Sequence, residues 1–186
     1  MSQKKAYVVG NNTRKSLSPT IFKHWFKKYN IDGDYGYIEI QNQNFETEIK
    51  KIIKKGNFCG LNITVPYKEK IIPHLFKTSE TSKEIGAVNC VTNKNGKLIG
   101  DNTDWQGFKD SIVWLEKNKL PTKIVKGSLA DLGGTAIVIG YGGSAKATVY
   151  ALTKMGYHTI KIFNRSFDKI KNLPPELRSN NKKNNN

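Results

Sequence analysis

Cysteine and long apolar runs are the first things this sequence lacks. Its 186 residues include two cysteines, Cys59 and Cys90, too few for a disulfide framework and without the spacing of metal ligands. We therefore expect two small buried thiols and no metal site. No apolar run approaches the roughly 18 residues that cross a membrane, which predicts a protein with no membrane contact. The first residues also lack the apolar stretch of a signal peptide, which predicts a cytoplasmic location.

Arginine is scarce although the chain is strongly basic. The 31 basic residues comprise 28 lysines and three arginines, against 15 acidic residues, and give a net charge of +16. This charge raises a nucleic-acid partner as a hypothesis, but phosphate and base recognition favours arginine forks. The lysines are scattered, and 19 asparagines accompany them, as an AT-rich coding sequence would produce. We therefore predict a solvated surface and no nucleic-acid partner.

Strand-like and helix-like segments alternate through the first hundred residues. Strands are predicted over residues 5–10, 35–40 and 58–64. A helix is expected to begin with Ser18 as N-cap and Pro19 at its first position, and a second is expected from Asn44 to Gly56. This alternation predicts an α/β fold with a mainly parallel sheet.

The second half begins with a predicted hairpin and then repeats the strand–helix pattern. Predicted strands cover residues 88–92, 97–100, 136–140 and 159–163, and predicted helices start near residues 104 and 144. Asn95 and Gly96 suit the hairpin turn. A polar connection spans residues 121–134, and we expect a disordered Lys/Asn-rich tail over residues 172–186 because it has too few apolar side chains to offset its ordering entropy.

A glycine-rich turn follows the strand predicted at residues 136–140. The cofactor-contacting residues expected there are Gly140, Tyr141, Gly142, Gly143, Ser144 and Ala145, which fit G-x-G-x-x-A between a strand and a helix. Gly140 permits the tight turn, Gly142 lets the backbone approach a pyrophosphate, and Ala145 allows close helix packing. The helix N-terminus attracts the anion. A glycine-rich turn without a ligand stays open as the alternative.

The end of the next strand distinguishes between two cofactors. A site for NAD usually has Asp or Glu there to bind the ribose hydroxyl groups. This chain has Asn164, Arg165 and Ser166 instead, with Lys169 three residues beyond. A guanidinium and an ammonium group suit a 2′-phosphate, so the sequence favours NADP. The alternative is that Arg165 is an ordinary surface charge.

Several short motifs occur together with this glycine turn. They are Ser16-Leu17-Ser18-Pro19, Asn62-Ile63-Thr64-Val65-Pro66-Tyr67-Lys68, Gly86-Ala87-Val88-Asn89 and Gly100-Asp101-Asn102-Thr103-Asp104, followed by Gly140–Ala145 and Asn164-Arg165-Ser166. In this order they closely resemble the shikimate dehydrogenase family over residues of about 5–170. The resemblance implies reversible, NADP-dependent oxidation of shikimate to 3-dehydroshikimate, a step of chorismate and aromatic amino acid biosynthesis.

The resemblance also implies roles for particular residues. Ser16 and Ser18 match the serines that bind the substrate carboxylate, and we expect Ser18 to serve both as ligand and as helix cap. Thr64 and Asn89 match positions that bind substrate hydroxyl groups, local backbone hydrogen bonds being their alternative. Lys68 and Asp104 match residues that both bind the substrate and act in catalysis. Lys68 is expected to be the main acid or base, and Asp104 to orient it. Glu80 matches a position sometimes assigned to cofactor contact.

The chain departs from the family in length and at one residue. Tyr141 replaces an alanine of the glycine loop, where it could point to solvent or crowd the pyrophosphate. The family's cofactor domain continues further, so we expect a C-terminally truncated chain with weak or no catalysis. The predicted domains are residues 1–102 for shikimate binding and 103–171 for an incomplete Rossmann NADP-binding domain. A quinate-accepting relative, a non-catalytic shikimate-binding protein and a homodimer stay open.

Overall fold

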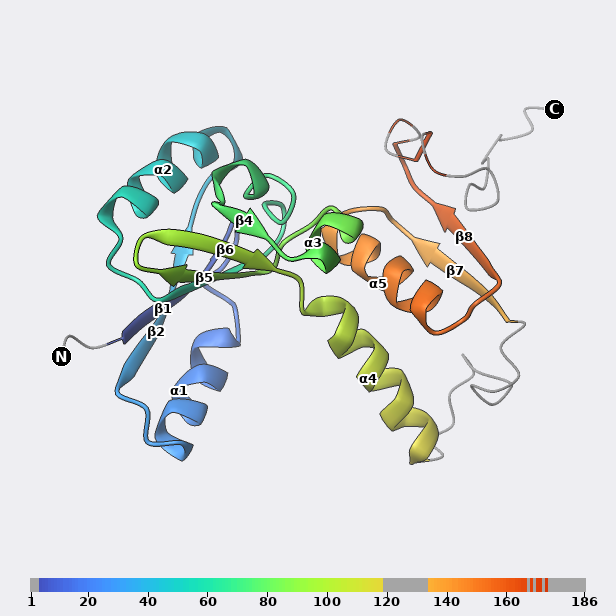
Figure 1. Ribbon diagram of the computed structural model, residues 1–186, viewed down its shortest axis with the longest axis horizontal. Helices are drawn as coiled ribbons and strands as arrows, with labels where there is room; N and C mark the ends of the chain where they lie inside the picture. Colours follow the sequence, from blue (N-terminus) through green and yellow to red (C-terminus); the bar gives the residue numbers. More distant parts are fainter. Residues whose placement is uncertain (1–3, 119–133, 167, 169, 172, 174–186) are drawn as a thin grey trace. The chain divides into compact units, whose positions relative to one another are not determined.

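The computed structural model describes residues 4–118, 134–166, 168, 170, 171 and 173 (Figure 1). The tail predicted over residues 172–186, apart from Leu173, lies outside the described residues, as do Lys169 and most of the connection at residues 121–134. The chain divides into two compact units, Met1–Asn102 (unit 1) and Thr103–Asn186 (unit 2). Each unit is described by itself below.

Unit 1 is built on one mixed sheet with the strand order β2-β1-β3-β5-β6-β4. Its strands are β1 (Lys4–Gly10), β2 (Gly33–Glu39), β3 (Gly60–Ile63), β4 (Lys77–Thr78), β5 (Cys90–Lys94) and β6 (Lys97–Asp101). β1 pairs in parallel with β2 and β3, and β4 with β6, whereas β5 runs antiparallel to β3 and β6. The predicted α/β fold with a mainly parallel sheet is confirmed, and the antiparallel strands come from the β5–β6 hairpin.

The main core of unit 1 lies between the sheet and helix α2 (Phe45–Lys55). Phe45 and Ile49, one helical turn apart, are at most 1% exposed and pack with strand residues such as Val9 and Leu61. Gly56 ends the helix in the left-handed conformation, with φ of 62°, which confirms the predicted helix stop. The core therefore fixes the β1 and β3 ends from which two of the predicted site loops start.

Helix α1 (Ser18–Lys28) differs from the prediction at its first residue. Its N-cap is Leu17 and no side chain caps it, so the prediction of Ser18 as N-cap is wrong. The physical reason is that the Ser18 hydroxyl accepts a hydrogen bond from Ser16 instead. Phe22 of this helix stacks on Tyr35 of β2 with ring centroids 4.1 Å apart, which attaches α1 to the sheet.

The β5–β6 hairpin confirms the predicted Asn-Gly turn. Asn95 and Gly96 have φ of 52° and 81°, the left-handed pair that a tight hairpin turn requires. A short helix that was not predicted, α3 (Glu80–Ile85), precedes the hairpin. Ser79 caps it by accepting from the Ser82 N–H at 3.1 Å.

Unit 2 contains a two-stranded parallel sheet and two helices among its described residues. They are α4 (Asp104–Lys117), β7 (Thr135–Ile139), α5 (Gly143–Lys154) and β8 (Thr159–Phe163). Trp105 of α4 meets Tyr150 of α5 edge to face at 5.3 Å, and Val138 of β7 is buried. Its neighbours Ile137 and Ile139 are 64% and 87% exposed, so one face of β7 is bare of described residues.

Neither cysteine is a fully buried thiol as predicted: Cys59 is exposed and donates to the Lys5 carbonyl at 3.1 Å, and Cys90 is half-buried. Cys59 lies in the bend that precedes β3, outside the strand itself. In the part of the chain that the structure describes, no helix is long and apolar enough to cross a membrane.

Candidate active site

The carboxyl ends of β1 and β3 lie side by side and start two of the predicted substrate loops. A Cβ added to Gly10, the last residue of β1, would lie 2.5 Å from the Thr64 methyl group, so this approach requires glycine. The Thr64 N–H donates to the Val9 carbonyl at 2.9 Å. Thr64 also borders a cavity of about 450 Å³ that includes Asn11, Asn42 and Pro66 in its lining. The loops after β1 and β3 are therefore held together at their starts.

Glu39 fixes the loop that carries the two serines. Its carboxylate accepts from the Thr13 N–H at 3.1 Å and lies 3.7 Å from the Arg14 guanidinium. The Thr13 hydroxyl is buried and donates to the Ile38 carbonyl at 3.1 Å. These contacts tie the segment before Ser16 to the end of β2.

The serines belong to a row of hydroxyl and amide groups. The Ser16 hydroxyl donates to the Ser18 hydroxyl at 3.1 Å and accepts from the Ser18 N–H at 3.2 Å. The Tyr35 hydroxyl donates to the Asn62 side-chain oxygen at 2.7 Å, and the Ser18 side chain lies near enough to Tyr35 to act against the rise in its pKa. Polar side chains from α1, β2 and β3 are thus neighbours beside the loop that carries the two serines. Hydroxyl groups are donors that a carboxylate ligand can accept from.

Tyr35 and Asn62 are the site residues that sequence reasoning missed. Burial and the nearby Cys90 raise the pKa of Tyr35 well above its ordinary value, so its hydroxyl keeps its proton. Burial, then Asp101, likewise raises the pKa of the Cys90 thiol. The signal available in the sequence was that Asn62 precedes Thr64 by two residues and therefore lies on the same sheet face.

Lys68 is a buried ammonium group, 9% exposed, on the segment that follows β3. Its carbonyl accepts from the Val88 N–H at 2.8 Å, and the Asn89 carbonyl accepts from the Ile63 N–H at 2.8 Å. The Val65–Pro66 peptide bond is cis. Backbone bonds therefore bring the Lys68 and Asn89 segments together beside β3, as the predicted substrate site requires. Buried lysines are rare and are usually paired or functional.

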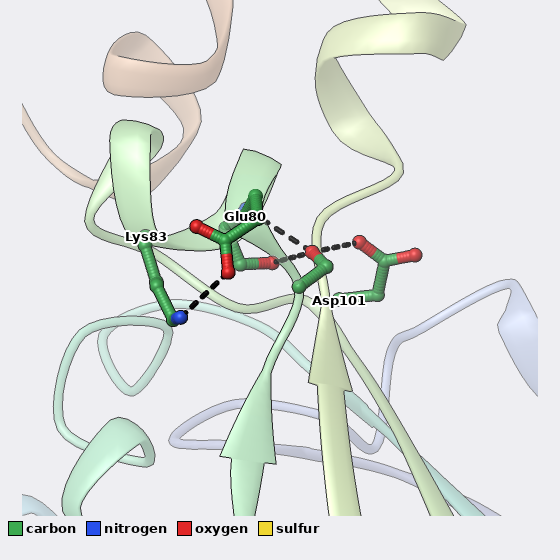
Figure 2. A network of polar contacts seen from close by, with 5 residues as sticks. Glu80, Lys83 and Asp101 are labelled. Carbon is green, nitrogen blue, oxygen red and sulfur yellow. Dashed lines mark hydrogen bonds and ion pairs between the residues drawn. The ribbon is translucent and has the colours of Figure 1, made fainter.

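A polar network that includes Glu80, Lys83 and Asp101 lies where β6 ends and α3 begins (Figure 2). The Asp101 carboxylate accepts from the Ser79 hydroxyl at 2.6 Å and from the Asn102 N–H at 2.8 Å. Glu80 contacts Lys83 at 2.7 Å, and its side chain is 82% exposed. Among the described residues of unit 1, no hydrogen bond or ion pair joins Glu80 to Ser16 or Ser18. The role of Glu80 in cofactor contact stays a prediction.

Asp104, the second predicted catalytic residue, is the first residue of α4 in unit 2. The Asn102 amide two residues earlier donates to the Ala87 carbonyl at 2.9 Å. That buried bond holds the C-terminal end of unit 1 in place. A contact between Asp104 and Lys68 stays a prediction.

The glycine turn of unit 2 has the geometry that a phosphate requires. Gly140 has φ of 95°, which favours glycine. A Cβ placed on Gly142 would meet no atom within 4 Å, so the space beside the turn is open. Gly143, Ser144 and Ala145 form the first turn of α5, where the helix dipole attracts an anion. These residues therefore fit a dinucleotide phosphate.

The strand after α5 supplies the other predicted cofactor residues. Asn164, Arg165 and Ser166 follow β8, and both Arg165 and Ser166 are exposed. The Asn164 side-chain oxygen accepts from the Tyr141 N–H at 3.1 Å. The Tyr141 side chain is half-buried and packs against the unit 2 core, with the Lys146 ammonium 5.7 Å from the ring centroid.

Among the described residues, no set of three His, Cys, Asp or Glu side chains is arranged to hold a metal ion.

Known proteins are similar to this chain over most of its length. Residues 8–91 match the family model for the shikimate dehydrogenase substrate binding domain. The chain is 37% identical over 171 residues to the shikimate dehydrogenase (NADP(+)) of Caldanaerobacter subterraneus, covering 92% of this chain and 56% of that protein. The Aquifex aeolicus shikimate dehydrogenase structure has a TM-score of 0.78 at 31% identity, covering 96% of this chain and 63% of the other.

A structure of Thermus thermophilus shikimate 5-dehydrogenase in complex with NADP(H) and shikimate matches with a TM-score of 0.75 at 28% identity, over 96% of this chain and 63% of that one. The chain thus spans about half the length of the curated relatives it matches. The match extends through both units, and the chain is similar to shikimate dehydrogenases over nine tenths or more of its length.

Proposed function

We propose that this chain carries the shikimate site and the first part of the NADP site of a shikimate dehydrogenase. The proposal makes unit 1 the shikimate-binding domain and unit 2 part of a Rossmann domain. The observation that carries it is the row from Ser16 through Ser18 and Tyr35 to Asn62, beside the segment with Lys68. The similarity to the shikimate dehydrogenase (NADP(+)) of Caldanaerobacter subterraneus supports the same assignment of the two units.

The substrate would bind with its carboxylate at the serines. Ser16 and Ser18 now bond to one another, and a carboxylate would accept from both hydroxyls once they rotate. Tyr35 can then donate to Ser18 or keep its bond to Asn62, so the buried hydroxyl stays satisfied in either case. Thr64 and Asn89 would bind ring hydroxyl groups, since both lie on segments adjoining β3.

Lys68 would move the proton of the reaction. NADP⁺, when bound, accepts the hydride from the substrate carbon that becomes the carbonyl. The hydroxyl proton leaves to the Lys68 amine, and in the reverse direction the Lys68 ammonium returns it to the forming alkoxide. Burial of Lys68 places the group away from bulk water. Asp104 would orient the ammonium and bind a hydroxyl group.

Arg165 would select the cofactor. It is exposed immediately after β8, where a guanidinium can bind a 2′-phosphate with two parallel hydrogen bonds. The glycine turn and the N-terminus of α5 would hold the pyrophosphate. Lys169 and Ser166 would add to the phosphate site.

The test separates binding from turnover. Shikimate is titrated into the 186-residue chain by calorimetry, and NADPH formation from shikimate is followed by absorbance. We expect Lys68→Met to retain shikimate binding within a few-fold but to lose whatever turnover the wild-type chain shows, alone or with the rest of a relative's cofactor domain supplied. The matched control is Lys70→Met, since Lys70 is exposed and bonds to Asn42 at 2.9 Å.

Three results of that experiment have distinct meanings. Shikimate binding with no turnover, even after the rest of a relative's cofactor domain is supplied, favours the shikimate-binding protein without catalysis. Turnover with quinate or NAD favours the quinate-accepting relative. No shikimate binding contradicts the proposal. A homodimer and a cytoplasmic location stay predictions from the sequence.

A further inference from the structure

We infer that Asn164 is a positioning residue, one that closes the glycine turn of unit 2 onto the end of β8 and does not itself bind the cofactor. The inference rests on the proposed function of that turn. It also means that the Tyr141 N–H, which donates to Asn164, does not donate to the cofactor phosphate. The sequence assigned both residues to direct cofactor contact.

Two hydrogen bonds attach the turn to β8. The Gly140 N–H donates to the Phe163 carbonyl at 2.7 Å and continues the β7–β8 pairing by one residue. The next amide, of Tyr141, has no strand partner opposite it and donates to the Asn164 side-chain oxygen at 3.1 Å. Asn164 therefore continues the ladder with its side chain where the backbone of β8 turns away.

The orientation of the Asn164 amide is determined by its partners. Its oxygen faces the Tyr141 N–H, and its nitrogen donates to the Ser166 carbonyl at 2.7 Å. A donor on one side and an acceptor on the other fit only one orientation of the amide. Because the nitrogen bonds to Ser166, the same side chain also fixes the backbone on both sides of Arg165. One asparagine thus sets the glycine turn and the predicted 2′-phosphate residue together.

The Tyr141 side chain supports the same arrangement. The ring packs against the unit 2 core, and the Lys146 ammonium lies 5.7 Å from its centroid. Backbone and side chain of Tyr141 are thus both engaged with protein groups. The pyrophosphate would meet the backbone from Gly142 onward, where the space is open, at the positive end of the α5 dipole.

The experiment has one arm without cofactor and one with it. In the cofactor-free 186-residue chain, amide hydrogen exchange of Tyr141 is measured by NMR for wild type, Asn164→Ala, Asn164→Asp and the control Asn118→Ala. Asn118 is an exposed asparagine of unit 2 whose side chain bonds to Trp114. We expect exchange of the Tyr141 amide to rise about tenfold in Asn164→Ala. Asn164→Asp, which keeps the acceptor, and Asn118→Ala should leave it near wild type.

The second arm measures dissociation constants for NADP⁺ and NAD⁺. We expect Asn164→Ala to weaken both by about the same factor, fivefold to tenfold, because both share the pyrophosphate. Arg165→Ala should weaken NADP⁺ alone. A direct contact of Asn164 with the cofactor would also weaken both, but it would leave the Tyr141 exchange rate of the free protein unchanged, and that result overturns the inference.

The two arms also separate this inference from the proposed function. If the wild-type chain binds neither cofactor, the proposed function of unit 2 fails and the inferred effect on binding fails with it. The exchange rates then still decide whether Asn164 closes the turn.

Discussion

Unit 1 and unit 2 differ in how completely their sheets are covered. In unit 1, the α2 face of the sheet is closed by apolar side chains such as Ile49, which has no exposed surface. In unit 2, Val138 of β7 is buried while Ile137 and Ile139 on the opposite face are largely exposed. The difference teaches that the predicted substrate loops start from a closed core, whereas the glycine turn starts from a strand with one face that the described residues of unit 2 leave uncovered.

The largest expected effect tests this difference in stability. Ile49→Ala should lower the free energy of unfolding of unit 1 by about 2–5 kcal/mol, because it leaves a cavity in a closed core. Ile139→Ala removes a similar side chain from an exposed position and should change the stability of unit 2 by less than about 0.5 kcal/mol. Urea titrations followed by NMR signals of each unit measure both. Equal losses in the two variants would contradict the comparison.

Cofactor selection in unit 2 gives the next largest effect. Arg165→Asp replaces a guanidinium with a carboxylate at the proposed 2′-phosphate site, so NADP⁺ affinity should fall roughly tenfold to a hundredfold through loss of a charge-assisted bond and added repulsion. NAD⁺ affinity should change little. Calorimetry with both cofactors gives the ratio, and Arg14→Asp in unit 1 is the charge-matched control. An unchanged NADP⁺ to NAD⁺ ratio would show that Arg165 is an ordinary surface charge.

Local sequence signals predicted most of the elements on which these sites are built. The Asn-Gly hairpin, the stop at Gly56 and strand β8 follow from turn chemistry and apolar pattern, and the structure confirms them. Helix α3 was missed because its six residues are too few to show a periodic apolar face. Its cap, Ser79, was the signal that could have revealed it.

Contacts between distant residues could not be predicted in the same way. The bond from Tyr35 to Asn62 joins side chains 27 positions apart. The cap assigned to Ser18 was wrong because that hydroxyl accepts from Ser16 instead. Asn164 was predicted at the cofactor site, but its bond to Tyr141, 23 positions earlier, needs the β7–β8 register. Residue types and short motifs thus indicated where the sites lie, and the fold determines which partner each side chain meets.

The smallest expected effect concerns pH and unit 1 alone. Burial raises the pKa of Tyr35 above 10.0 and that of Cys90 above 9.0, so the folded chain keeps both protons after the unfolded chain has begun to release them. Stability from these groups is complete below about pH 9 and falls as the pH rises further. Unfolding of wild type and Tyr35→Phe is compared by urea titration across the alkaline range.

Tyr35→Phe should show a shallower alkaline decline than wild type, because one of the groups with a raised pKa is gone. The control is Tyr29→Phe, since Tyr29 is 62% exposed and should decline as wild type does. A steeper decline in Tyr35→Phe than in wild type would contradict the assigned direction of the pKa.

The most direct test of the shikimate site is a titration of the isotope-labelled 186-residue chain with shikimate, followed residue by residue by NMR. The account predicts that the amide signals of Ser16, Ser18, Thr64 and Asn89 shift together along one binding curve, and that Ser16→Ala weakens that curve while Thr20→Ala, an exposed neighbour in α1, does not. A binding curve confined to other residues, or no curve at all, would contradict the assignment of unit 1 as the shikimate-binding domain.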